Sequence, residues 1–242
     1  GLPDTQPDVV LTLAGLPDWG QVGGNARHAN PQAKNWAMNA ERERIPMLFM
    51  AGRTPILEQG VTGSRSLNIH WAQEMFDQGG LVREIVKWDY ELRDARQTAT
   101  VVDRALAITR SDPKAPVYLT LPREVLAAEA PVSPALGTPT MAPAAASAPD
   151  PDAIAAAADF LARAERPLIV AASAGRNPAT VPVLSDLAQR HALPVVEFRP
   201  RYLNLATDHP MHLGFEVAPH IADADAILVL DCDVPWIPAQ AA

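Results

Sequence analysis

The sequence of 242 residues is poor in cysteine, in aromatic residues and in clustered positive charge. Its one cysteine, Cys232, excludes a disulfide within the chain and a cysteine-based metal cluster, and its apolar surroundings predict a buried, inert thiol. The formal net charge is -8 and no Lys/Arg-rich run occurs, which argues against binding of nucleic acid through a basic face. A small molecule or a second copy of the chain is therefore the expected partner.

Long apolar runs are also missing. No stretch approaches the roughly 20 apolar residues that a membrane-spanning helix needs, so we expect no membrane partner. The first residues, Gly1 to Asp4, have neither the basic nor the apolar region of a secretory signal, and there is no initiator methionine. These features predict a soluble, cytoplasmic protein whose start is truncated or processed.

The composition changes abruptly between residues 127 and 150. This stretch holds five prolines, many alanines and no Lys or Arg. Proline removes backbone donors and disfavours helix in the residue before it, so we expect an extended linker. A low-complexity interaction segment is the alternative, but a structured pattern resumes directly afterwards. The linker would separate a domain at residues 1–126 from a second domain at residues 151–242.

Short apolar runs alternate with helical patterns in the first domain. We expect strands at residues 47–51, 81–88 and 117–121, and helices at residues 66–78 and 94–110. The second helix should bury one face, made by Thr98, Val101, Val102, Ala105, Leu106 and Thr109. The first 44 residues fit this scheme poorly: residues 9–14 could form a strand, whereas residues 21–39 suggest loop and irregular helix.

The same alternation recurs after the linker. We expect strands at residues 168–172, 195–198 and 226–230. Helices should begin at Asp150-Pro151 and Asn177-Pro178, with a short one near residues 217–222. The inner face of the first of these helices should be Ile154, Ala157, Ala158 and Leu161. Strands separated by helices favour parallel sheets, so the expected fold class is α/β with two parallel-sheet domains.

Three motifs of the first domain resemble a known family. Its strand ending at Gly52 is followed by Gln73-Glu74 after an aromatic residue, and a later strand ends in Pro122-Arg123-Glu124-Val125. In this order and spacing they resemble the second half of the pyrimidine-binding domain of thiamine-diphosphate-dependent enzymes, in the acetolactate synthase-like branch. Residues 151–242 resemble part of the central domain of the same family.

The resemblance implies an enzyme that uses thiamine diphosphate and Mg²⁺ to decarboxylate a 2-keto acid and to transfer or protonate what remains. It also implies a homodimer or tetramer with sites between subunits. The activating glutamate of the family has no match in residues 1–44, and the Gly-Asp-Gly that holds Mg²⁺ and diphosphate occurs nowhere in the sequence. We therefore expect part of a longer protein that is inactive alone.

Three residues are candidates for the site. Gln73 resembles a residue that reaches the substrate end of the cofactor, where an amide can donate to a keto oxygen without titrating; a surface glutamine is the alternative. Arg123 occupies the basic position of the family and could bind a substrate carboxylate in bidentate geometry, or instead pair with Glu124. His70 could act as a catalytic residue that moves protons, or could simply pack or cap.

The residues of this chain predict neither a metal site nor a flavin. His209-Pro210-Met211-His212 has no acidic or Cys partner at ligand spacing, and Gly52 to Pro55 lacks the spacing and Lys of a phosphate-binding loop. Ala172 to Arg176 lies in the region that flavin-binding relatives use, but other flavin contacts are not recognisable, so FAD is not expected. A flavin- or nucleotide-binding module without thiamine chemistry, or a non-catalytic oligomerisation fragment, are the alternatives.

Overall fold

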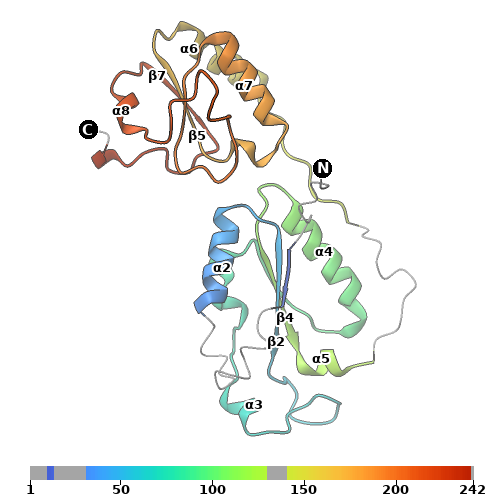
Figure 1. Ribbon diagram of the computed structural model, residues 1–242. Coiled ribbons are helices and arrows are strands. Elements are labelled where there is room, and N and C mark those ends of the chain that lie inside the picture. Colours follow the sequence, from blue (N-terminus) through green and yellow to red (C-terminus); the bar gives the residue numbers. More distant parts are fainter. Residues whose placement is uncertain (1–9, 14–30, 130–140, 241–242) are drawn as a thin grey trace. The chain divides into compact units, whose positions relative to one another are not determined.

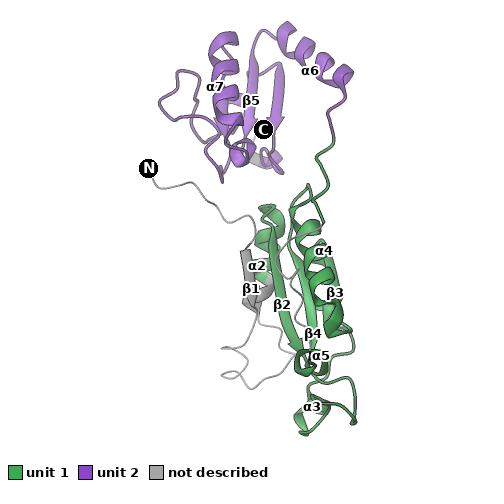
Figure 2. Cartoon of the chain, turned by 90° about the vertical axis from the view of Figure 1, so that its right-hand side faces the viewer, with its two compact units in different colours: residues 1–147 green, residues 148–242 purple. Residues whose placement is uncertain are grey.

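The computed structural model describes residues 10–13, 31–129 and 141–240 (Figure 1). The chain forms two compact units, Gly1–Ser147 and Ala148–Ala242 (Figure 2). Each unit contains a parallel sheet with helices, which confirms the predicted α/β class. Residues 141–150 of the expected linker carry neither helix nor strand, whereas residues 130–140 lie outside the described part. The assignment of the first unit as part of a pyrimidine-binding domain, and of the second as part of a central domain, remains a prediction.

The first unit is built on a four-stranded parallel sheet with the order β1-β2-β4-β3. Its strands are β1 (Val10–Leu13), β2 (Met47–Arg53), β3 (Trp88–Glu91) and β4 (Val117–Pro122). The helices α2 (Pro31–Arg42) and α4 (Thr98–Arg110) cover opposite faces of this sheet (Figure 1). Strand β1 matches the expectation for residues 9–14, and α2 is a regular helix where an irregular one was expected.

Alternation along the strands explains how both faces become buried. Leu48 of β2 packs with Val101 and Ala105 of α4, while the next residue, Phe49, packs with Ala37 of α2. Successive side chains of a strand point to opposite faces, so a strand covered on both sides is apolar throughout. Of the face expected on α4, Val101, Ala105 and Thr109 are buried and Val102 and Leu106 are half-buried, which confirms the helical period there, whereas Thr98 in the first turn is exposed.

The segment between β2 and β3 differs from the prediction. The helix expected at residues 66–78 is wrong: only α3 (Ile69–Ala72) is α-helical. The strand expected at residues 81–88 is also wrong, because short 3₁₀ turns occupy Gly79–Leu81 and Arg83–Ile85 and β3 begins only at Trp88. Polar side chains here bind backbone groups and distant side chains, and these contacts override the local helix propensity.

The second unit holds a three-stranded parallel sheet with the order β6-β5-β7. The strands are β5 (Pro167–Ala171), β6 (Val195–Glu197) and β7 (Ala226–Leu230), all near their expected positions. Its helices are α6 (Pro151–Arg163), α7 (Thr180–His191) and the short α8 (Ala218–Ile221).

Helix α6 begins as expected but packs differently. The Asp150 side chain accepts a hydrogen bond from the N–H of Asp152, and Pro151 occupies the first turn. The predicted inner face is wrong, because α6 has no buried residue and Ile154 is 57% exposed. The described contact of α6 with the sheet is with β7, a strand at its edge, so the apolar side of this helix is left largely uncovered.

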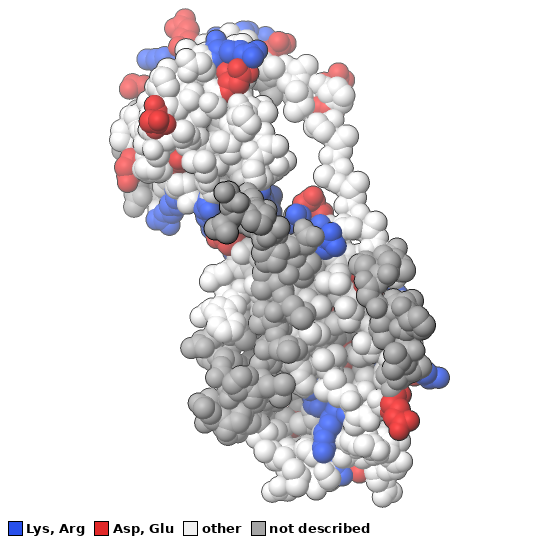
Figure 3. Space-filling view, turned by 45° about the vertical axis from the view of Figure 1, so that its right-hand side comes forward, with Lys and Arg blue, Asp and Glu red and all other residues white. Residues whose placement is uncertain are grey.

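Two expectations from composition can be compared with the structure. Cys232 is half-buried rather than fully buried, and burial raises the pKa of its thiol. Among the described residues, no helix is long and apolar enough to cross a membrane. Acidic and basic side chains are interspersed on the face shown in Figure 3, with no broad basic area.

Candidate functional site

The predicted site residues lie beyond one edge of the first sheet. Strands β2 and β4 run in parallel register and end together at Arg53 and Pro122. The short helix α5 (Arg123–Ala127) starts directly after β4, and the chain leaves β2 into residues 54–78, which we call the 54–78 segment (Figure 1). In open parallel sheets, ligands bind outside the carboxyl ends of the strands. Both segments therefore start from the edge where a site is expected.

Arg123 and His70 are brought together although they lie far apart in the sequence. Nη1 of Arg123 is 3.4 Å from Nε2 of His70 and donates to Oγ of Ser66 at 3.2 Å. No carboxylate forms an ion pair with Arg123 among the described residues. The carboxylate of Glu124, the alternative partner, accepts a hydrogen bond from the N–H of Leu57 at 2.6 Å. Arg123 is exposed to solvent.

The environment of His70 favours the neutral imidazole. Nδ1 accepts hydrogen bonds from the backbone N–H groups of Ser66 at 3.1 Å and Leu67 at 3.4 Å. Burial lowers the pKa of His70 below its ordinary value, and the positive charges of Arg123 and Arg65 lower it further. The geometry places His70 beside Arg123, but its role in moving protons stays a prediction.

Gln73 lies on the same segment, three residues after His70. It ends helix α3, where its N–H donates to the carbonyl of Ile69 at 3.0 Å, and its side chain is half-buried. The structure therefore puts Gln73, His70 and Arg123 into one region of the first unit. That the amide of Gln73 faces a substrate remains a prediction.

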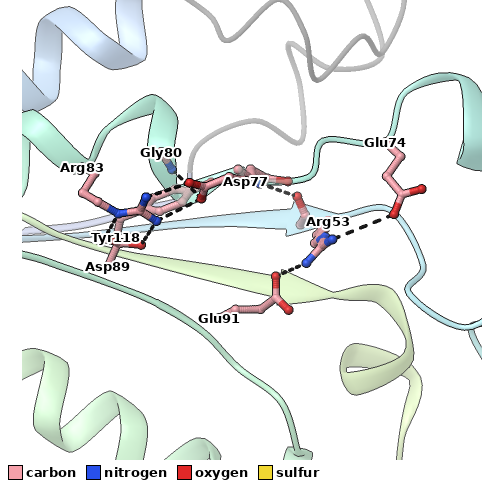
Figure 4. Close-up of polar contacts among 10 residues, drawn as sticks. Arg53, Glu74, Asp77, Gly80, Arg83, Asp89, Glu91 and Tyr118 are labelled. Atoms are coloured by element: carbon pink, nitrogen blue, oxygen red, sulfur yellow. Dashed lines mark hydrogen bonds and ion pairs between the residues drawn. The ribbon is translucent and has the colours of Figure 1, made fainter.

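A chain of ion pairs holds the 54–78 segment to the sheet, and the sequence reading missed it. The side chain of Arg65 is only 4% exposed, and its Nη2 lies 2.6 Å from Oε2 of Glu74. Glu74 also lies 3.9 Å from Arg53, and Arg53 in turn pairs with Glu91 at the end of β3 (Figure 4). The pKa of Arg65 is raised, chiefly by its hydrogen bond with Glu74. A buried guanidinium needs such partners, because an unpaired charge inside a protein is costly.

Gln78 fixes the other end of the segment. Its buried amide donates to the carbonyl of Gly52 at 3.0 Å and to the hydroxyl of Tyr118 at 2.9 Å, which connects it to β2 and β4. Burial raises the pKa of Tyr118, so its hydroxyl stays neutral at ordinary pH. Nearby, the guanidinium of Arg83 bridges the carboxylates of Asp77 and Asp89 (Figure 4). These bonds fix the turn that returns the chain to β3.

The second unit contains a buried polar cluster that spacing along the sequence did not reveal. Nε2 of His212 lies 3.0 Å from Oε2 of Glu197, and the amide of Asn204 donates to Oε1 at 2.7 Å. No acidic residue stands at ligand spacing from His212 in the sequence, and Glu197 becomes its partner only because the chain folds back beside β6. No group of three metal-ligating side chains is found in the part of the chain that the structure describes.

The segment from Ala172 to Arg176 is packed against the protein itself. The N–H of Gly175 donates to Oδ1 of Asn204 at 3.0 Å, and a Cβ at Gly175 would lie 1.8 Å from the carbonyl oxygen of Leu203. Arg176 pairs with Asp231 at 2.8 Å and lies over the ring of Tyr202. The small residue is thus explained by the close approach of Leu203, without a ligand.

The donors among the residues that the structure describes do not fit Mg²⁺ and a diphosphate. The sequence contains no Gly-Asp-Gly, and the described residues contain no cluster of acids or histidines that could hold a cation.

Comparison with known proteins identifies relatives of this chain. It is 26% identical over 185 residues to the acetolactate synthase large subunit of Parasynechococcus marenigrum, covering 73% of this chain and 28% of the relative. It is 25% identical over 208 residues to oxalyl-CoA decarboxylase of Escherichia coli, covering 84% and 35%. It is 29% identical over 202 residues to the probable 2-ketoarginine decarboxylase of Pseudomonas aeruginosa, covering 81% and 34%. The chain thus spans about a third of the length of these relatives.

A solved structure supports the same fold. The thiamine diphosphate-dependent 4-hydroxybenzoylformate decarboxylase of Rhodococcus jostii RHA1 superposes with a TM-score of 0.69 at 22% identity, covering 91% of this chain and 39% of that one. A scan against models of protein families finds no match. The resemblance seen in the motifs is confirmed.

Proposed function

We propose that this chain, which is similar to part of a thiamine-diphosphate-dependent enzyme, forms the substrate side of a site that decarboxylates a 2-keto acid. The observation that carries this proposal is the meeting of the His70–Gln73 region with Arg123 at the carboxyl edge of the first sheet. Two of the three curated relatives above are named as decarboxylases, and the third as an acetolactate synthase.

The residues of this chain would bind and orient the substrate. Arg123 would hold the carboxylate, and the amide of Gln73 would donate to the keto oxygen, where negative charge develops. Thiamine diphosphate would supply the electron sink when bound, and the protein would supply orientation and charge stabilisation. The groups that hold the diphosphate and Mg²⁺ would come from outside these 242 residues.

A second copy of the chain is the proposed partner. The 54–78 segment exposes large apolar side chains, with Phe76 97% exposed and Trp71 49% exposed. Large apolar side chains that are exposed close together in the sequence are candidates for an interface between proteins. A homodimer or tetramer would cover it, and sedimentation or light scattering of the protein measures that state directly.

Release of CO₂ tests the proposed reaction. Protein made from the complete reading frame, supplied with thiamine diphosphate and Mg²⁺, should release CO₂ from a 2-keto acid, whereas the 242 residues alone should not. Arg123→Gln should raise KM about tenfold or more, because a charge-assisted bond to the substrate is lost. Arg96→Gln, at an exposed arginine paired only with Asp94, is the matched control. Unchanged KM in Arg123→Gln would remove Arg123 from the substrate site.

A further inference from the structure

His70 is approached by hydrogen-bond donors on both ring nitrogens. The N–H groups of Ser66 and Leu67 point at Nδ1, and Nη1 of Arg123 faces Nε2 at 3.4 Å. A neutral imidazole has one donor and one acceptor nitrogen, and an imidazolium has two donors. One ring nitrogen of His70 must therefore carry a proton that points at another hydrogen-bond donor.

The two sides are not equivalent. Nδ1 receives two backbone N–H groups, the nearer at 3.1 Å, and a backbone N–H cannot change its role. Arg123, in contrast, has another acceptor within reach, Oγ of Ser66 at 3.2 Å. The lone pair therefore sits on Nδ1, and the proton sits on Nε2. The imidazolium is disfavoured because burial and two neighbouring guanidinium groups lower the pKa of His70.

The Nε2–H of His70 and the guanidinium of Arg123 then stand side by side as donors. No acceptor for the Nε2–H is found among the described residues. The nearest acid in sequence, Glu124, has one carboxylate oxygen bound to the N–H of Leu57 and the other buried without a partner, so it does not close this gap. Arg65 is different, because Glu74 and Glu58 already surround its charge.

We infer that neutral His70 and Arg123 form a two-donor clamp for a carboxylate, with Nε2–H and the guanidinium each binding one oxygen. His70 then serves as a fixed donor, and not as the group that carries a proton. That the carboxylate belongs to a 2-keto acid rests on the proposed function; the clamp itself rests on the donor geometry. A single carboxylate with two oxygens matches two adjacent donors, one of them cationic.

Nitrogen NMR of the 242-residue chain with ¹⁵N-labelled histidine tests both parts of this inference. The chain has six histidines, and His70→Gln identifies the resonances of His70. We expect the proton on Nε2 and a lone pair on Nδ1. Addition of pyruvate should shift the Nε2–H resonance saturably, and methyl pyruvate, which lacks the charge, should not. A proton on Nδ1, or an equal response to methyl pyruvate, would overturn the inference.

Variants separate binding from folding and from thiamine chemistry. Arg123→Gln should weaken the apparent affinity for pyruvate about ten- to hundredfold, the range for loss of a charged hydrogen bond, while Arg96→Gln leaves it unchanged. His70→Gln keeps an N–H donor and should therefore retain the binding of pyruvate. His70→Leu removes this donor and should lose the binding, while an unchanged circular dichroism spectrum shows that the variant is folded. No cofactor is present in these titrations. A saturable response to pyruvate therefore supports the clamp even if the complete protein fails to bind thiamine diphosphate. If pyruvate gives no saturable response, the clamp is refuted and the proposed function is not.

Discussion

The guanidinium of Arg65 lies 2.6 Å from the carboxylate of Glu74 and is almost fully covered, with 4% of its side chain exposed. The same guanidinium donates to the carbonyl of His70 at 3.2 Å. Glu74 in turn approaches Arg53 at the end of β2. The pair thus joins the segment that carries His70 and Gln73 to the sheet edge that precedes Arg123, and its integrity decides whether the three predicted site residues stay together.

Replacing Arg65 by Met should loosen the 54–78 segment without unfolding the sheet. The variant leaves Glu74 with only the distant Arg53 and frees the carbonyl of His70. We expect the amides of residues 66–74 to exchange hydrogen about tenfold faster or more, while those of β2 and β4 keep their rates. Hydrogen exchange followed by mass spectrometry measures this, with Arg96→Met as the control. Equal rates in the segment would show that the ion pair does not hold it.

Asn204 should be one of the most sensitive positions of the second unit. Its fully buried amide donates to Glu197 at 2.7 Å and to the carbonyl of Ala172 at 3.0 Å. Asn204→Ala removes these side-chain bonds and leaves the buried N–H of Gly175 without its acceptor, Oδ1 of Asn204, so the free energy of unfolding should fall by about 2–4 kcal/mol. Asp186→Ala breaks only the exposed pair with Arg190 and should cost less than about 0.5 kcal/mol. Urea titration gives both values, and a similar loss in the two variants would contradict the account.

A methyl group added at Gly175, in the 3₁₀ turn Ala174–Arg176, should be far more damaging than one added at Gly52 of β2. At Gly175 an added Cβ would lie 1.8 Å from the carbonyl oxygen of Leu203, whereas at Gly52 nothing lies within 4 Å of it. Gly175→Ala should therefore destabilise the protein by about 2–3 kcal/mol or more, because backbone must move. Gly52→Ala should change the unfolding free energy by less than about 0.5 kcal/mol. Thermal or urea unfolding of both variants decides it; a harmless Gly175→Ala would refute the close approach of Leu203.

His70 should make stability depend on pH below neutrality. Its pKa is lowered in the folded state below the ordinary histidine value of about 6.5, so the unfolded chain binds the proton more readily. Stability contributed by the neutral imidazole is therefore complete above pH 6.5 and is lost as the pH falls below that value towards the folded pKa. The charged groups that act on this ring are Arg123, Arg65 and Glu124. The loss of unfolding free energy between pH 7.5 and 5.5 should be smaller in His70→Gln than in the unchanged chain, and an equal loss would assign it to other groups.

The sequence predicts the structure of a segment well where local features, such as an apolar run or a helix cap, determine it. It predicts less where contacts with residues far along the chain determine the structure. The apolar runs of β2, β4 and β5 are buried on both faces, so their composition alone predicts them. The cap at Asp150-Pro151 is equally local and was predicted correctly. The apolar face of α6 was misplaced because burial depends on which strand the helix meets, and that is a property of the tertiary structure.

In the candidate site, too, some residues were predicted from the sequence and some of their contacts were not. Motif order indicated Arg123 and Gln73, and the fold brings their segments to one edge. Two ion pairs were not predicted. Arg53 and Glu91 end two different strands that only the folded sheet brings together, and Arg65 and Glu74 lie in a segment with no regular period that would indicate their contact. The pairing of His212 with Glu197 was missed for the same reason: residues 198–212 return beside β6 without a helical or strand period that would indicate it.

Calorimetric titration of thiamine diphosphate into the protein from the complete reading frame, in the presence of Mg²⁺, tests the central claim most directly. The account predicts saturable binding that disappears when Mg²⁺ is removed by a chelator, since a divalent cation would hold the diphosphate. A complete, folded protein that gives no binding heat at any Mg²⁺ concentration would contradict the assignment to thiamine chemistry.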